Sequence, residues 1–71
     1  MQVIKVELYV IDFDGLNADG VKDVIENARY PNHCINPKVI TSDARYIGAW
    51  DDSHPLNNRA TAIDEIRRLF A

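Results

Sequence analysis

The sequence has little positive charge and only one cysteine. Its 71 residues include 8 Lys and Arg against 11 Asp and Glu, a formal net charge of −3. Proteins that bind the DNA or RNA backbone have a surplus of basic residues, so this balance argues against nucleic-acid binding. The lone Cys34 can form neither an internal disulfide nor a CxxC metal site. A small domain without disulfides is typical of a reducing compartment, so we expect a cytoplasmic protein.

Long apolar runs and targeting signals are also missing. No stretch approaches the roughly 18 apolar residues of a membrane span, so we expect no membrane association. The chain opens directly into an alternating pattern with no basic region before it, so we expect no signal peptide. Its 46% apolar and 27% charged residues are typical of a globular protein. The length predicts a single domain over residues 1–71.

Two segments have the pattern of extended chain. In the first, Val3–Phe13, apolar side chains occupy every second position: Ile4, Val6, Leu8 and Val10. This alternation predicts a strand with one buried face. The second segment, Lys38–Trp50, alternates less regularly, and Ser42-Asp43 equally suits a bulge or a tight hairpin turn.

Two other segments have the spacing of amphipathic helices. The first helix is expected to begin at an Asn17 N-cap and to end near Arg29, because Pro31 drives Tyr30 out of the helical region. Its apolar face consists of Val21, Val24, Ile25 and Ala28. The second helix is expected to follow a cap at Asn57 or Asn58. Its apolar face consists of Ala62, Ile63, Ile66, Leu69 and Phe70.

The order strand, helix, strand, helix predicts the α+β fold class. We expect a small two-layer β-α-β-α domain, with two to three strands and two helices on one face of the sheet. A sheet this narrow consists mostly of edges, and edges pair readily with another chain. We therefore expect a homodimer that extends the sheet or covers its exposed face.

The end of the first predicted strand carries a candidate catalytic motif. Tyr9–Gly15 resembles the first motif of haloacid-dehalogenase-type phosphatases, which have a nucleophilic, Mg²⁺-binding Asp and an acid/base Asp two residues later. Asp12 and Asp14 match these positions, but Leu16 stands where the family has Thr. The family's remaining motifs belong to a far larger sheet. We therefore prefer an acidic turn that caps the next helix.

Candidate metal ligands and nucleophiles are scattered over separate loops. His33, His54 and the acidic pair Asp51-Asp52 are residue types that bind Zn²⁺ or iron, but their spacing matches no ligand pattern. Cys34 adjoins His33, and neighbours in an extended loop point apart, which argues against a thiol nucleophile. We therefore expect no metal, no cofactor and no enzymatic activity.

The segment Trp50–Asn58 concentrates unusual residues between the second extended segment and the second helix. It contains the only Trp, two adjacent acids, a His and a Pro. Trp and Tyr are enriched in binding hot spots, which favours an exposed contact role for Trp50. Burial of Trp50 in the core beneath the loop is equally consistent with the sequence. With the loop at Tyr30–Cys34, this segment forms the predicted interaction surface. Its residues are Tyr30, Asn32, His33, Trp50, Asp51, Asp52, His54 and Asn57.

Three stretches, Val10–Gly15, Glu26–Ile35 and Ile47–Asn57, together cover much of the chain. They resemble a group of small uncharacterised proteins of tailed bacteriophages. The resemblance implies an accessory protein made in the cytoplasm of the bacterial host, and such proteins often act by binding a host or phage protein. We therefore expect a non-catalytic protein-interaction module with an unidentified protein partner.

Two alternatives to the interaction module stay open. One is a small-molecule-binding protein or minimal metal-dependent enzyme that uses Asp12, Asp14, His33 and the loop Asp51-Asp52-Ser53-His54; convergence of these side chains on a concave pocket would favour it. The other is a structural component of the virion.

Overall fold

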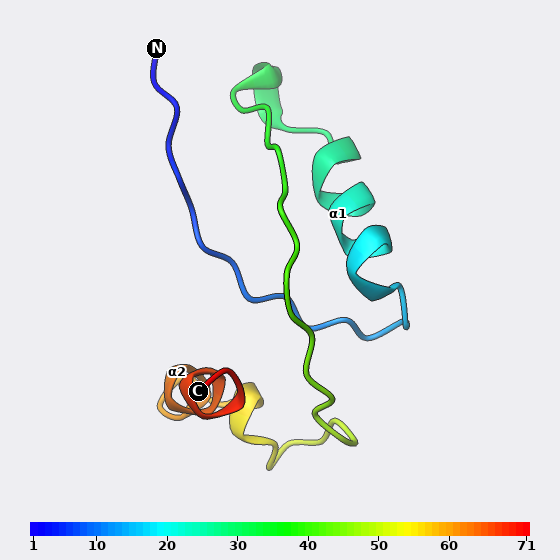
Figure 1. The fold of residues 1–71 in the computed structure, drawn as a ribbon, viewed down its shortest axis with the longest axis vertical. Helices are drawn as coiled ribbons and strands as arrows, with labels where there is room; N and C mark the ends of the chain where they lie inside the picture. The colour runs from blue at the N-terminus through cyan, green and yellow to red at the C-terminus, as the bar shows by residue number, and fades with distance from the viewer.

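The computed structural model describes all residues, 1–71, and contains helices but no strand. The two α-helices are α1 (Asn17–Asn27) and α2 (Ala62–Leu69), and two single-turn 3₁₀ helices, η1 (Pro31–His33) and η2 (Pro55–Asn57), lie between them. In Figure 1 the N-terminal segment runs down the long axis, α1 returns up it, and the segment after η1 runs down again. No helix is both long and apolar enough to cross a lipid bilayer.

The predicted α+β fold is wrong, because neither extended segment forms a strand. The chain has 20 backbone–backbone hydrogen bonds, 11 of them within helices and 9 in turns and caps. A protein of this length usually has roughly 50. None joins Val3–Phe13 to Lys38–Trp50, so the two-layer domain with two to three strands and helices on one face is not formed. The alternative hairpin at Ser42-Asp43 is not formed either.

The second extended segment is bonded to the helices rather than to the first segment. The Val39 N–H donates to Glu26 Oε2 of α1 at 2.8 Å. Farther along, Arg45 Nε donates to the Leu69 carbonyl of α2 at 2.9 Å. Side chains of the helices and of the segment itself therefore hold this segment, and its alternating pattern specifies an extended backbone without specifying a neighbouring strand.

The chain is more open than a compact protein of its size. Its radius of gyration is 14.1 Å, against about 11 Å for a compact domain of 71 residues. Its accessible surface is 6745 Å², against about 4,500 Å² for a compact protein of 8.1 kDa. No residue is buried, so the apolar faces predicted to form a core remain partly or fully exposed.

The first predicted helix is present, but its start differs from the expectation. Asn17 is its first residue, with a positive φ of 64°, and does not act as the N-cap. Leu16 occupies the cap position and makes no side-chain cap bond. Asp12 accepts instead, from the Leu16 and Asn17 N–H groups at 3.0 and 2.9 Å. Two of the free N–H groups at the start of the helix are therefore satisfied by a side chain four and five residues upstream.

The first helix ends earlier than expected. It stops at Asn27, and Ala28 is already extended, so Arg29 lies outside it. The Tyr30 hydroxyl donates to the Ile25 carbonyl at 2.6 Å and so satisfies one of the last free carbonyls. Pro31 follows and begins η1, which agrees with its predicted role as a helix stop.

The second predicted helix is present and begins after a compact turn. The Asn58 carbonyl accepts from Ala62 N–H at 2.9 Å, and its side chain accepts from Ala60 N–H at 2.8 Å. Thr61 occupies the cap position without a side-chain cap bond. Of the predicted apolar face, only Ile63 is exposed, while the other members are half-buried: Ala62, Ile66, Leu69 and Phe70.

Gly20 provides the first test of this geometry. A Cβ at this position would lie 2.8 Å from the Cβ of Leu16. Helix propensity alone predicts that Gly20→Ala stabilises α1 by about 1 kcal/mol. Because the Leu16 Cβ is fixed to the backbone, we expect the reverse, a loss of about 1 kcal/mol in the free energy of unfolding, measured by urea denaturation with circular dichroism.

A double-mutant cycle separates this contact from helix propensity. In a Leu16→Gly background the Cβ that would meet the new methyl group is gone, so Gly20→Ala should then stabilise the chain. A stabilisation of about 1 kcal/mol in the unmodified background would contradict the contact.

Candidate functional site

Trp50 is packed between two other rings at the end of the second extended segment. The Phe13 ring meets it edge-on, with centroids 5.1 Å apart and an interplanar angle of 86°. The His54 ring stacks on it at 5.0 Å and 27°. Trp50 is half-buried by these contacts. Of its two predicted roles, the structure favours the anchor beneath the loop over the exposed contact residue.

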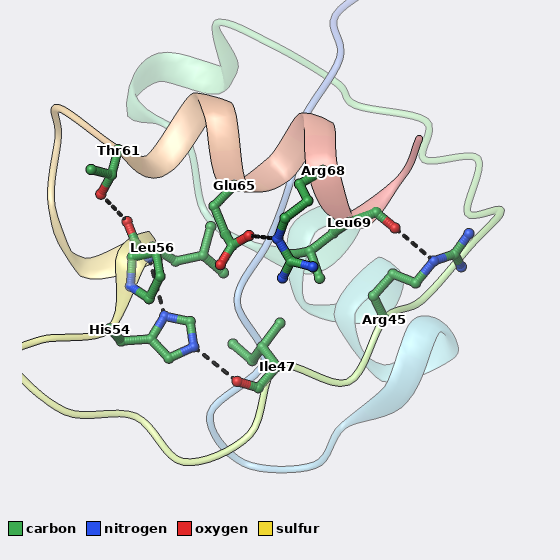
Figure 2. Close-up of polar contacts among 9 residues, drawn as sticks. Arg45, Ile47, His54, Leu56, Thr61, Glu65, Arg68 and Leu69 are labelled. Carbon is green, nitrogen blue, oxygen red and sulfur yellow. Dashed lines mark hydrogen bonds and ion pairs between the residues drawn. The ribbon is translucent and has the colours of Figure 1, made fainter.

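His54 uses both ring nitrogens, one toward the end of the second extended segment and one within its own loop (Figure 2). Nε2 lies 2.9 Å from the Ile47 carbonyl, and Nδ1 lies 3.1 Å from the Leu56 N–H at the start of η2. A carbonyl can only accept and an N–H can only donate, so the neutral ring with its proton on Nε2 satisfies both partners. The His54 imidazole therefore has a structural role, which we call the His54 clasp: it links the Ile47 carbonyl to the Leu56 N–H. Neither ring nitrogen is free to bind a metal or to accept a proton from a substrate.

Asp51, rather than Asp52, fixes the turn that follows Trp50. Its Oδ1 accepts from the Ser53 hydroxyl at 2.8 Å and from the Ser53 N–H at 2.9 Å. These bonds, the hydroxyl first, lower the pKa of the Asp51 carboxyl below its ordinary value. The Asn57 side-chain amide also donates to the Asp51 carbonyl, at 3.2 Å. Asp52 is exposed and makes no hydrogen bond, so it is the free acid of the loop.

The loop is also fastened to the last helix. The Thr61 hydroxyl donates to the Pro55 carbonyl at 2.6 Å (Figure 2). One turn farther along α2, Glu65 is hydrogen-bonded to Arg68, with its side chain only 12% exposed. This bond lowers the pKa of the Glu65 carboxyl. The Trp50–Asn58 loop is therefore held by ring stacking at one end and, at the other, by the hydrogen bond from Thr61, the residue before α2.

The other half of the predicted interaction surface lies elsewhere. In Figure 1, η1 (green) stands at the upper end of the long axis and the Trp50–Asn58 loop (yellow-green) at the lower end of a molecule 39 Å long. Asn32 and His33 are exposed and have positive φ angles of 56° and 52°. Tyr30 is half-buried, with its hydroxyl used by α1. The two predicted loops therefore form two separate surfaces.

Asp12, the candidate nucleophile, is bonded to the backbone around the start of α1. Its carboxylate accepts from the N–H groups of Asp14 at 3.3 Å, Leu16 at 3.0 Å and Asn17 at 2.9 Å. These bonds, led by that from Leu16, lower the pKa of the Asp12 carboxyl. The structure thus favours the acidic turn that caps the next helix, although the strand predicted before it is missing.

The other candidate catalytic groups do not gather around Asp12. No three His, Cys, Asp or Glu side chains come close enough together to hold a metal ion. Asp14 is exposed and its side chain accepts no hydrogen bond, and Cys34 is exposed on the loop after η1. The arrangement required by the metal-dependent alternative, with both loops converging on Asp12 and Asp14, is absent.

Sequence reasoning missed a groove between the N-terminal segment and α2. Its volume is about 400 Å³. The lining residues are Glu7, Tyr9, Ile63, Ile66, Arg67 and Phe70. Tyr9 packs on Phe70 with ring centroids 5.4 Å apart, and Arg45 lies 4.9 Å from the centre of the same ring. The apolar face of α2 was the available signal, but its pairing with Tyr9 is a long-range contact that periodicity does not show.

No family model matches this chain, and neither a curated protein nor a solved structure is significantly similar to it. Functional inference therefore depends on the geometry and chemistry of its own residues.

Asp12→Ala tests the capping role. Loss of the carboxylate should loosen the first turn of α1, with about tenfold faster hydrogen exchange at the Leu16 and Asn17 amides measured by NMR. Asp14→Ala, which removes an unbonded acid two residues away, should leave these rates unchanged. Equal effects of the two substitutions would contradict the cap.

The lowered pKa gives the same cap a pH dependence. Ionised Asp12 is favoured in the folded chain, so its stabilisation is fully present above the ordinary pKa of 3.8 and is lost as the pH falls through the lower folded value. Exchange at the two amides should therefore accelerate, relative to the intrinsic rate, only below about pH 4.

His54→Ala tests the clasp. It removes two hydrogen bonds to the backbone and the stack on Trp50, so the free energy of unfolding should fall by about 2 kcal/mol in thermal or urea denaturation. His33→Ala, in the exposed loop at the other end, should change it by less than about 0.5 kcal/mol. Similar losses in both variants would show that the loop is not fixed by His54.

Proposed function

We propose that this protein is a small non-catalytic module that binds another protein through the Trp50–Asn58 loop. One observation carries the proposal. The groups that could have acted as nucleophile or base, Asp12, Asp51 and His54, are hydrogen-bonded within their own turns. The same bonds build a loop of fixed shape.

A fixed loop suits recognition because little conformational freedom remains to be lost on binding. Trp50 and His54 support the loop from within, and Asp51 closes its first turn. The outward groups are then those of Asp52, Ser53 and Pro55, all exposed. Asp52 supplies an unpaired negative charge, so we expect a partner with a basic or hydrogen-bond-donating surface at that point.

The resemblance to small proteins of tailed bacteriophages suggests the setting: an accessory protein in the cytoplasm of the host, acting on a host or phage protein. The net charge of −3 favours a protein partner over nucleic acid. The alternative of a small-molecule-binding protein or metal-dependent enzyme gains no support, because η1, which contains His33, stands at the opposite end from the Trp50–Asn58 loop. In addition, no three His, Cys, Asp or Glu side chains lie close enough together to hold a metal ion.

The proposal is tested with a charge reversal that leaves the loop intact. Immobilised protein is used to capture partners from bacterial lysate, and each captured protein is purified and titrated by calorimetry. Asp52→Arg should weaken binding of the true partner at least about tenfold, because a free charge at the contact is reversed.

Asp43→Arg is the matched control, since Asp43 is an equally exposed acid without a hydrogen bond in the second extended segment. It should leave the dissociation constant within about twofold. If every purified partner binds Asp52→Arg as tightly as the unmodified protein, the loop is not the contact surface. If no captured protein binds after purification, the proposed function is wrong.

A further inference from the structure

The N-terminal segment is the largest apolar feature that the loop does not use. The side chains that would have formed the buried face of a strand are more than half exposed: Ile4 at 71%, Val6 at 67%, Leu8 at 64% and Val10 at 52%. None of the N–H or carbonyl groups of residues 1–10 takes part in a backbone hydrogen bond. A monomer rarely leaves such a segment in water, because both its apolar side chains and its free backbone groups favour association.

The exposed surface of the whole chain sets an upper limit on the size of the missing contact. The chain exposes 6745 Å², about 2,200 Å² more than a compact protein of its mass. If each of two chains covered this excess, the interface would total roughly 4,400 Å², within the range of about 2,000–5,000 Å² typical of obligate dimers. A transient contact of standard size, about 800 Å² on each partner, would leave most of the excess exposed.

The segment is complementary to itself. With Val6 on a two-fold axis and two copies antiparallel, Ile4 of one copy lies opposite Leu8 of the other. In the same register Lys5 of each copy lies opposite Glu7 of the other, so opposite charges meet twice. An in-register parallel arrangement would instead place Lys5 against Lys5. Opposite charges that flank a central apolar residue are what a two-fold interface between identical chains requires.

We propose that a second copy of this chain covers the N-terminal segment, with the two segments antiparallel about a two-fold axis near Val6. The two copies exchange backbone hydrogen bonds there, and Ile4, Val6 and Leu8 of both copies pack against one another on one face of the two-stranded ribbon. The contact is separate from the Trp50–Asn58 loop, which stays available at the lower end of each copy (Figure 1).

The full chain is tested by sedimentation velocity and light scattering between 1 and 100 µM. The expected mass is about 16 kDa, twice the 8.1 kDa of one chain. Lys5→Glu places like charges opposite each other twice in the dimer, so it should raise the dimer dissociation constant at least about tenfold. The double variant Lys5→Glu/Glu7→Lys restores opposite charges and should return the constant to within about threefold of the original.

Lys38→Glu is the matched control: an exposed lysine outside the segment, whose reversal should leave the dissociation constant unchanged. An 8 kDa species throughout the concentration range overturns the proposal. So does a dimer that responds to Lys38→Glu as strongly as to Lys5→Glu, or one that the double variant fails to restore. A monomer that binds a different protein through this segment also overturns the dimer. That result would not affect the proposed function, which is tested separately by the effect of Asp52→Arg on partner binding.

Discussion

The stack of Phe13, Trp50 and His54 is the contact on which the lower half of the molecule depends. The chain has no buried residue, so no core fixes the relative positions of its parts. The stack joins the end of the N-terminal segment to the end of the second extended segment and to the loop that leads into α2. Aromatic pairs of this kind each contribute about 0.5–1.5 kcal/mol beyond the area that they bury.

Tyr9 and Arg45 also contact the Phe70 ring, and the second extended segment is otherwise held by single polar contacts. Glu26 fixes the backbone of the second segment at Val39, and Arg45 fixes it again at the last turn of α2. A net hydrogen bond contributes only about 0.5–1.5 kcal/mol, so each contact is weak. Association that covers the exposed apolar face would therefore add far more stability than any contact within the chain. The proposed function and a gain in stability would thus both depend on contact with other chains.

The helices could be predicted from the sequence and the pairing of the extended segments could not. A period of 3.6 is a local property, and it identified α1 and α2, although Val24, Ala28 and Ile63 of the predicted apolar faces are exposed. Alternation in Val3–Phe13 is also local, but the strand that it predicted is not formed. Whether a neighbouring strand pairs with that backbone depends on the position of the rest of the chain, and here no bond forms.

The candidate site shows the same division between local and long-range information. The acidic turn at Asp12 is a short-range feature and was the preferred reading of the sequence, whereas the sequence left the inward and outward roles of Trp50 equally open. The choice of Asp51 over Asp52 depends on which carboxylate reaches Ser53. The contact between Trp50 and Phe13 and the placement of Tyr30–Cys34 at the opposite end are set by the tertiary arrangement, for which the sequence gives no periodic signal.

The central claim is that Trp50 and His54 face inward and hold the loop in one shape. The most direct measurement is an NMR spectrum of the full chain that assigns the histidine tautomers and the contacts of the single indole. The account predicts the His54 tautomer that carries its proton on Nε2, with nuclear Overhauser effects from the Trp50 ring to both Phe13 and His54. A Trp50 ring with the chemical shifts of unstructured chain and no such effects would contradict it.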